Sequence, residues 1–133
     1  MAEDNRIFDI HQRIFLWVIA VLKFLDKVPR TIKTTPIISQ LASSITSVGA
    51  NDREANSAES SRDFCHKYGI AKKEADESVY WLLVIGELYG YLKPQTVQLS
   101  EEGKEIISIL ATIIRKSKIT SNERENNSKA REK

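Results

Sequence analysis

The stretch DIHQRIFLWVIAVLKFLD, residues 9–26, decides the fold of this chain. Apolar side chains recur in it at spacings of three and four, which is the period of an amphipathic helix. One face of the expected helix carries Ile10, Ile14, Trp17, Val21 and Phe24. Asp9 stands where a carboxylate can accept hydrogen bonds from the free N–H groups of a first turn. The stretch therefore predicts a helix over residues 9–26 that Asp9 caps.

The same helix has a second apolar face, formed by Phe15, Ile19 and Leu22. A helix that is apolar on both faces must either lie deep inside its own bundle or find a partner outside it. Two interpretations therefore stay open: a central buried helix, or a helix whose second face packs against another copy of the chain.

Residues 35–56 predict a second helix, with Thr35 as its cap and Pro36 at the first helical position, where no N–H is needed. Its apolar stripe consists of Leu41, Ile45, Val48 and Ala55. Small side chains beside this stripe allow another helix to approach closely; they are Ala42, Ser43, Ser44, Ser47, Gly49 and Ala50. Such a segment is weak as an isolated helix, so packing must stabilise it.

A third helix is expected from a cap at Ser60 or Ser61 to about Leu88, with Lys72 and Asp76 as an i,i+4 ion pair. Residues 90–98 contain Pro94 and predict a loop, after which Ser100 is expected to cap a fourth helix. The apolar face of this fourth helix carries Ile106, Ile107, Ile109, Leu110, Ile113 and Ile114.

Short loops between long amphipathic helices favour antiparallel neighbours. We therefore expect an all-α fold, an antiparallel up-down-up-down four-helix bundle over residues 1–116. Residues 117–133 show no apolar periodicity and predict a polar, disordered tail. The body holds fifteen basic and fifteen acidic residues, so the formal charge of +2 comes from the tail. A neutral body does not by itself predict nucleic-acid binding, because phosphate contacts need clustered cations.

The sequence predicts no metal, no cofactor and no enzymatic activity. A di-metal site in a helical bundle needs two Glu-x-x-His pairs; Asp63 precedes His66 at that spacing, but Phe8 precedes His11. Glycine-rich phosphate loops, nucleophile elbows and Cys-x-x-Cys pairs do not occur. With a single cysteine, a polar N-terminus and a longest apolar run of nine residues, the chain is expected to be cytoplasmic and not to span a membrane.

A set of polar residues follows one edge of the second helix, at spacings of three, four and three: Ser44, Ser47, Asn51 and Glu54. The third helix offers Lys73, Glu74 and Glu77 opposite them. These side chains fit a hydrogen-bonded seam that fixes the helix register. A ligand or nucleic-acid contact and a pair of catalytic carboxylates are the alternatives.

Two blocks of the sequence carry a resemblance: QLASSITSVGANDREA, residues 40–55, and DFCHKYGIAKKEADESVYWL, residues 63–82. In residue types, order and separation they are similar to the four-helix-bundle proteins encoded in intervening sequences of bacterial 23S rRNA genes. The accessory proteins of diversity-generating retroelements have a similar fold. The signature positions are Gln40, Ser44, Ser47, Asn51, Glu54, Glu74, Glu77 and Trp81. Ser43 stands where many members have Arg, which weakens any phosphate contact by the second helix.

The resemblance implies a ring-like homopentamer without established enzymatic activity. The first functional hypothesis is an RNA- or DNA-binding scaffold whose basic surface forms on assembly. Copies of one of two basic sets would supply that surface: Lys27, Arg30 and Lys33, or Arg115, Lys116 and Lys118. The second hypothesis is a protein-interaction adaptor for a reverse transcriptase or a ribosomal component, which would use an apolar groove instead of charge.

Overall fold

The computed structural model describes residues 4–132, with side chains from residue 10 onward, and this part of the chain contains four α-helices and no strand. The helices are α1 (Asp4–Leu25), α2 (Thr34–Asn56), α3 (Ser61–Leu88) and α4 (Lys93–Glu132), with a short 3-10 turn, Gly90–Leu92, before α4. The all-α, four-helix prediction is confirmed. Each helix contacts the next along the chain, and α1 also contacts α4, so the four follow one another around a bundle.

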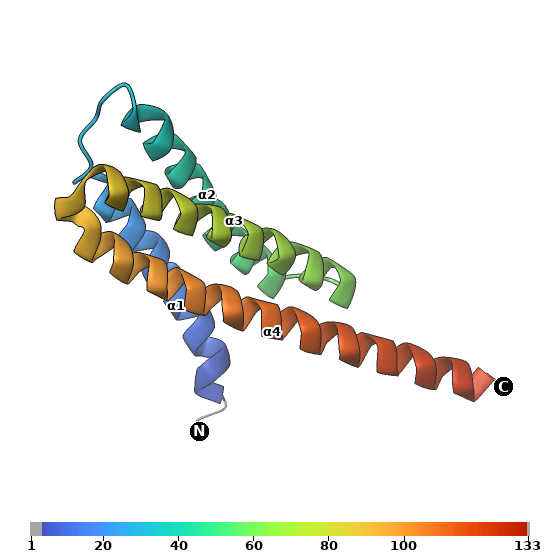
Figure 1. Ribbon diagram of the computed structural model, residues 1–133. Helices are drawn as coiled ribbons and strands as arrows, with labels where there is room; N and C mark the ends of the chain where they lie inside the picture. The colour runs from blue at the N-terminus through green and yellow to red at the C-terminus, as the bar shows by residue number, and fades with distance from the viewer. Residues whose placement is uncertain (1–3, 133) are drawn as a thin grey trace.

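The helices are not equally aligned in this bundle. In Figure 1, α2, α3 and α4 run in alternating directions, whereas α1 crosses α4 instead of lying along it. The C-terminal part of α4, drawn in red, projects beyond the other helices.

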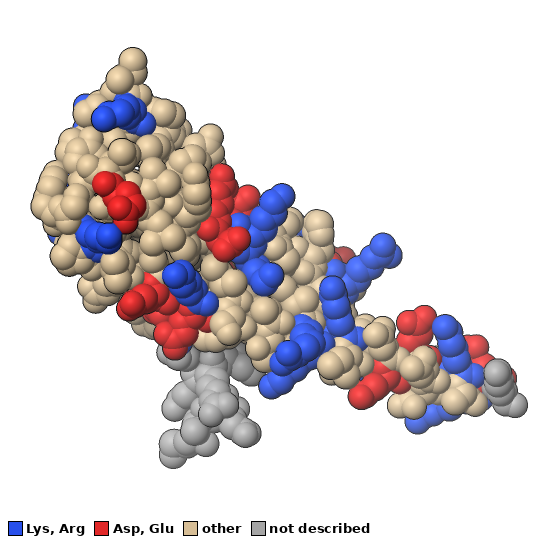
Figure 2. Space-filling model, in the orientation of Figure 1, with Lys and Arg blue, Asp and Glu red and all other residues tan. Residues whose placement is uncertain are grey.

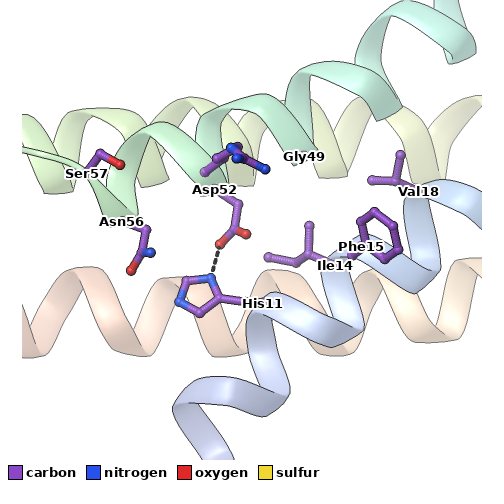
Figure 3. Close-up of a pocket in the computed structure, with 9 residues that line it drawn as sticks. His11, Ile14, Phe15, Val18, Gly49, Asp52, Asn56 and Ser57 are labelled. Atoms are coloured by element: carbon purple, nitrogen blue, oxygen red, sulfur yellow. Dashed lines mark hydrogen bonds and ion pairs between the residues drawn. The ribbon is translucent and has the colours of Figure 1, made fainter.

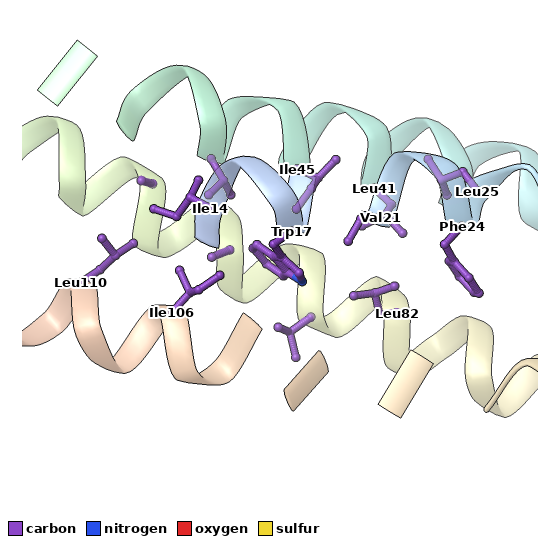
Figure 4. Close-up of a cluster of buried hydrophobic side chains, with 14 of the residues drawn as sticks. Ile14, Trp17, Val21, Phe24, Leu25, Leu41, Ile45, Leu82, Ile106 and Leu110 are labelled. Atoms are coloured by element: carbon purple, nitrogen blue, oxygen red, sulfur yellow. The ribbon is translucent and has the colours of Figure 1, made fainter. Parts of the chain in front are cut away.

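The core is the set of apolar stripes that the sequence predicted. Figure 4 shows Ile14, Trp17 and Val21 of α1 facing Ile45 of α2, Leu82 of α3 and the α4 pair Ile106 and Leu110. All of these side chains are at most 2% exposed. The core covers the second face of α1 only in part: Phe15 is 63% exposed, Ile19 is half-buried, and Leu22 is half-buried against the edge of the core. Within one chain, the interpretation of a fully buried α1 is wrong.

The predicted helix starts differ from the structure at three places. Helix α1 begins at Asp4, so Asp9 lies inside it and is not its cap; residues 4–8 contain no Pro or Gly that would stop the helix. Helix α2 begins at Thr34, and Thr35 is not its cap. Instead Thr31 Oγ1 accepts hydrogen bonds from the backbone N–H of Lys33 and of Thr34, both at 3.2 Å.

Helix α4 begins seven residues before the predicted cap, Ser100. Pro94 is the second residue of α4, a position where a missing N–H breaks no helical bond. Ser100 is buried inside the helix, and its hydroxyl has no hydrogen-bond partner among residues 10–132. The third helix follows the prediction, since the Ser60 hydroxyl accepts from the Asp63 N–H at 3.1 Å.

The tail also differs from its prediction, because α4 continues to Glu132 and residues 117–132 are helical. These residues are mostly exposed, as their polar sequence requires. They contain neither Gly nor Pro, and many are good helix formers such as Glu, Lys, Arg and Ala. Glu125 and Lys129 form an i,i+4 ion pair at 3.4 Å. A helix already nucleated by packing is extended at low cost by such residues.

Candidate functional site

Basic side chains gather in a groove between the first half of α3 and the second half of α4. Figure 2 shows Lys and Arg side chains clustered over the middle of the elongated body. Two adjoining hollows of about 380 and 450 Å³ form the groove. Their basic lining residues are Arg62, His66, Lys72, Arg115 and Lys118. Among residues 10–132, no Asp or Glu lines either hollow.

Helical periodicity explains why these residues meet. On α3, positions 62, 65, 66 and 72 recur at helical spacing and face α4; on α4, positions 111, 114, 115, 118, 119 and 122 face α3. The floor of the groove is apolar, with Ile114 and Ile119, and its far end is polar, with Ser121 and Asn122. Long basic side chains can cover such a floor with their methylenes and keep their charges in water.

The groove cations are not neutralised by close carboxylates. Among residues 10–132, ion pairs within 4 Å join other residues: His11–Asp52, Arg13–Glu102, Arg13–Glu105, Lys67–Glu54, Lys93–Glu87 and Lys129–Glu125. The predicted pair of Lys72 with Asp76 is therefore wrong, and Lys72 reaches toward α4 instead. Free cations on a grooved surface are suited to binding an anionic chain.

The structure separates the two basic sets that the sequence proposed. Arg115 and Lys118 line the groove, and Lys116 is exposed beside them on α4. The other set, Lys27, Arg30 and Lys33, is exposed on the connection between α1 and α2, at the other end of the bundle (Figure 1). Sequence reasoning missed Arg62, His66 and Lys72; their helical spacing on the face of α3 that turns toward α4 is the signal that could have found them.

The signature polar residues form a seam between α2 and α3. Ser44, which is 1% exposed, lies 2.7 Å from the hydroxyl of Ser78, which is fully buried. Asn51 Nδ2 donates to the backbone oxygen of Ser47 at 2.9 Å and to its hydroxyl at 3.1 Å. Lys67 Nζ lies 3.2 Å from Glu54. The Ser44–Ser78 and Glu54–Lys67 contacts join α2 to α3 in a defined register, and the Asn51–Ser47 contacts lie within α2.

The four other signature residues, Gln40, Glu74, Glu77 and Trp81, lie toward the surface of that seam. Gln40 is exposed. Partial burial of the Glu74 carboxyl, together with the nearby charge of Glu77, raises the pKa of Glu74. Trp81 packs edge-to-face against Tyr80, with ring centroids 4.9 Å apart. The buried indole N–H of Trp81 has no acceptor among residues 10–132. The signature residues thus mainly pack α2 against α3, and Glu74 and Glu77 lie at the edge of this contact.

A second pocket, of about 430 Å³, lies between α1 and α2 around a buried carboxylate (Figure 3). Asp52 Oδ1 accepts from the Tyr68 hydroxyl at 2.9 Å and lies 2.8 Å from His11 Nδ1. The apolar wall is formed by Ile14, Phe15 and Val18. Gly49, Arg53, Asn56 and Ser57 complete the lining. The hydrogen-bonded residues His11, Asp52 and Tyr68 come from α1, α2 and α3, so no sequence spacing could reveal this cluster.

Within the described residues, no group of three or more His, Cys, Asp or Glu side chains is placed to hold a metal ion. None of the described helices combines the length and the apolar character that a membrane span requires.

Known proteins share this sequence pattern and fold. Residues 6–112 match a family model described as 23S rRNA-intervening sequence protein. The chain is also similar to a solved protein of unknown function from the S23 ribosomal protein family of Bacteroides thetaiotaomicron VPI-5482. The two chains are 30% identical, the alignment covers 79% of this chain and 97% of that one, and the TM-score is 0.72. No curated protein matches the chain in sequence.

Proposed function

The chain belongs to the 23S rRNA-intervening sequence protein family, and from this premise we propose that it is a non-catalytic, self-associating helical bundle that binds RNA or DNA. The observation that carries the proposal is the α3–α4 groove, where Arg62, Lys72, Arg115 and Lys118 lie together and no carboxylate of residues 10–132 joins the lining. Two of these four residues belong to a basic set that the sequence nominated on its own.

Affinity in such a groove would come from phosphate contacts. Each phosphate that a cation neutralises releases a counterion, so the logarithm of the binding constant falls by about 0.9 per contact for each tenfold rise in salt on duplex DNA, and by about 0.7 on single strands. Four cations per chain therefore predict a slope of roughly −3 to −4 for one copy. Self-association would bring several grooves to one nucleic acid and increase the slope.

The face of α1 that the core leaves uncovered supports self-association. Phe15 and Leu16 are 63% and 54% exposed, and Ile19 and Leu22 are only half-buried. A contiguous apolar strip of this kind on a helix is suited to packing against another copy. A homopentamer, as the resemblance implies, would place five basic grooves around one ring.

The experiment that tests the proposal compares two triple variants of equal charge loss. The groove variant carries Lys72→Ser, Arg115→Ser and Lys118→Ser; the matched control carries Lys27→Ser, Arg30→Ser and Lys33→Ser. Fluorescence anisotropy with labelled generic RNA and DNA is measured between low and moderate salt. We expect the groove variant to lose at least tenfold in affinity and the control to lose less. Equal losses, or binding by the unaltered chain that salt does not weaken, would contradict the groove assignment.

A second candidate function is a protein-interaction adaptor for a reverse transcriptase or a ribosomal component. Exposed apolar side chains on α3 and the turn after it favour it, notably Tyr80 at 58%, Leu83 at 43% and Tyr91 at 70% exposure. Partners that stay bound in a pull-down after nuclease treatment, and are released by Leu83→Ser, would support this function over nucleic-acid binding.

A further inference from the structure

The pocket between α1 and α2 has a feature that neither the core nor the basic groove explains. Asp52 is 7% exposed, and both hydrogen bonds to its carboxylate fall on the same oxygen, Oδ1. No side chain or backbone group of residues 10–132 donates to Oδ2. Oδ2 is also not among the fully enclosed polar atoms that lack a partner. The second carboxylate oxygen is therefore open to the pocket.

The surroundings hold this carboxylate firmly in place. Tyr68 is 2% exposed, and burial and the charge of Asp52 raise the pKa of Tyr68 far above its usual value, so its hydroxyl remains a donor. His11 provides the second donor from α1 when the proton is on Nδ1. A carboxylate fixed by two donors from two other helices is a preorganised acceptor.

The rest of the pocket is shaped for an apolar body. Figure 3 shows Ile14, Phe15 and Val18 on one side of the opening, next to the carboxylate of Asp52. The floor is formed at Gly49, where an added β-carbon would lie 3.4 Å from Val18 Cγ2. Phe15 is 63% exposed, and the face of an aromatic ring attracts a cation. Among residues 10–132, Arg53 is the one Lys or Arg that lines the pocket; it is exposed and follows Asp52 on the helix, about 100° away around the axis.

We propose that this pocket binds an alkylammonium or alkylguanidinium group, whose charged head contacts Asp52 Oδ2 and whose methylenes pack against Ile14, Phe15 and Val18. Charge-assisted hydrogen bonds to a partly desolvated carboxylate are the strong ones, which is why a cation is preferred over a neutral alcohol of the same shape. Two sources offer this chemistry: a free organic amine or guanidine, and a Lys or Arg side chain of a second copy of the chain. The proposal does not depend on nucleic-acid binding.

The direct test uses n-butylammonium as the probe and 1-butanol as its neutral counterpart of equal size. Amide chemical shifts of the full chain are followed by NMR, with Gly49 and Asn56 as reporters at the pocket. We expect saturable binding of n-butylammonium with a dissociation constant on the order of 1 mM, a value reasonable for so small a ligand. The alcohol should bind at least tenfold more weakly.

Variants assign the binding to Asp52. Asp52→Asn keeps an acceptor for Tyr68 and removes the charge, and it should weaken n-butylammonium at least tenfold. The matched control, Asp76→Asn, removes an exposed carboxylate from α3 and should leave binding unchanged. If Asp52→Asn fails to fold, as judged by circular dichroism, Gly49→Ala takes its place: a methyl group there narrows the pocket floor and should weaken binding without removing a buried charge.

Light scattering separates the two sources of the cation. If a basic side chain of another copy fills the pocket, then Asp52→Asn or an excess of n-butylammonium lowers the mass of the assembly, and 1-butanol does not. If the ligand is free, the mass stays constant while the pocket resonances shift. The proposal is overturned if n-butylammonium changes neither the resonances nor the mass, if the alcohol acts equally well, or if Asp52→Asn responds as the unaltered chain does.

Discussion

Trp17 of α1 and Gly103 of α4 are in direct contact: a β-carbon at position 103 would lie 2.5 Å from Trp17 Cζ2. The same β-carbon would lie 2.7 Å from Val79 Cγ2 of α3. The Trp17 indole N–H donates to the backbone oxygen of Leu99 at 2.9 Å, so the ring is held by α4 at its polar edge as well. The close approach of α1 to α4 therefore depends on the absence of a side chain at Gly103.

Gly103→Ala is expected to destabilise the bundle. Overpacking of a core costs typically about 1–3 kcal/mol, and Ala regains about 1 kcal/mol of helix propensity over Gly. We expect a net loss of up to about 2 kcal/mol in the free energy of unfolding in urea. Gly69→Ala is the matched control, because nothing lies within 4 Å of its added β-carbon. That variant should be more stable by up to about 1 kcal/mol, and a stabilising effect at both glycines would contradict the contact.

The contact between Ser44 and Ser78 predicts that substitutions at these two positions are not additive in the free energy of unfolding. Ser44→Ala breaks the buried contact with Ser78 and should lower the free energy of unfolding by about 1 kcal/mol. The double variant Ser44→Ala with Ser78→Ala should lose less than the sum of the single variants, since neither hydroxyl is then left without its partner. Ser43→Ala, at an exposed position, should stay within about 0.5 kcal/mol of the unaltered chain. Strict additivity would show that the two hydroxyls do not interact.

The apolar stripes were predictable because a helix buries residues at a fixed period. The five residues expected on the inner face of α1 are all buried, and so are Leu41, Ile45, Val48 and Ala55 of α2. These residues follow from local spacing alone, without knowledge of which helix faces which. For the same reason the seam could be proposed from spacings of three and four along one helix.

The sites that join different helices were not predictable. Asp52 meets His11 across 41 residues and Tyr68 across 16, and both contacts depend on the rotation and axial position of three helices. Periodicity leaves those quantities open. The start of α4 was missed for another reason: Pro94 was interpreted as part of a loop, although Pro is equally suited to a first helical turn.

Glu74 predicts a pH-dependent contribution to stability. Burial, with the charge of Glu77 second, raises its pKa in the folded state above the unfolded value, so the folded chain binds that proton more tightly. The stabilisation is present at low pH and is lost as pH rises through the unfolded and then the folded pKa. Glu74→Gln should therefore raise the thermal midpoint near about pH 8 and leave it unchanged near about pH 3. Curves that stay parallel over this range would contradict the interpretation.

The exposed face of α1 predicts an assembly that one substitution can weaken. Leu16 is 54% exposed in the single chain, and Leu16→Glu would place a charge in any interface formed there. We expect light scattering to give a mass well above the 15.1 kDa of one chain for the unaltered protein and a lower mass for Leu16→Glu. Leu16→Met, which keeps the apolar volume, should assemble normally. A monomeric unaltered chain, or a full-size assembly of Leu16→Glu, would contradict this role of α1.

Because the end of α4 projects beyond the other helices, we expect that its deletion lowers the helix content but leaves the free energy of unfolding almost unchanged. Residues 123–132 are helical but exposed, so a chain that ends at Asn122 keeps the whole core and the groove. Its free energy of unfolding should change by less than about 0.5 kcal/mol. The ellipticity per molecule at the helical minimum should nevertheless decrease, because the deleted residues contribute helix and not coil. If the truncated and full chains gave the same ellipticity per molecule, residues 123–132 would not be helical in solution, which would contradict the projecting helix.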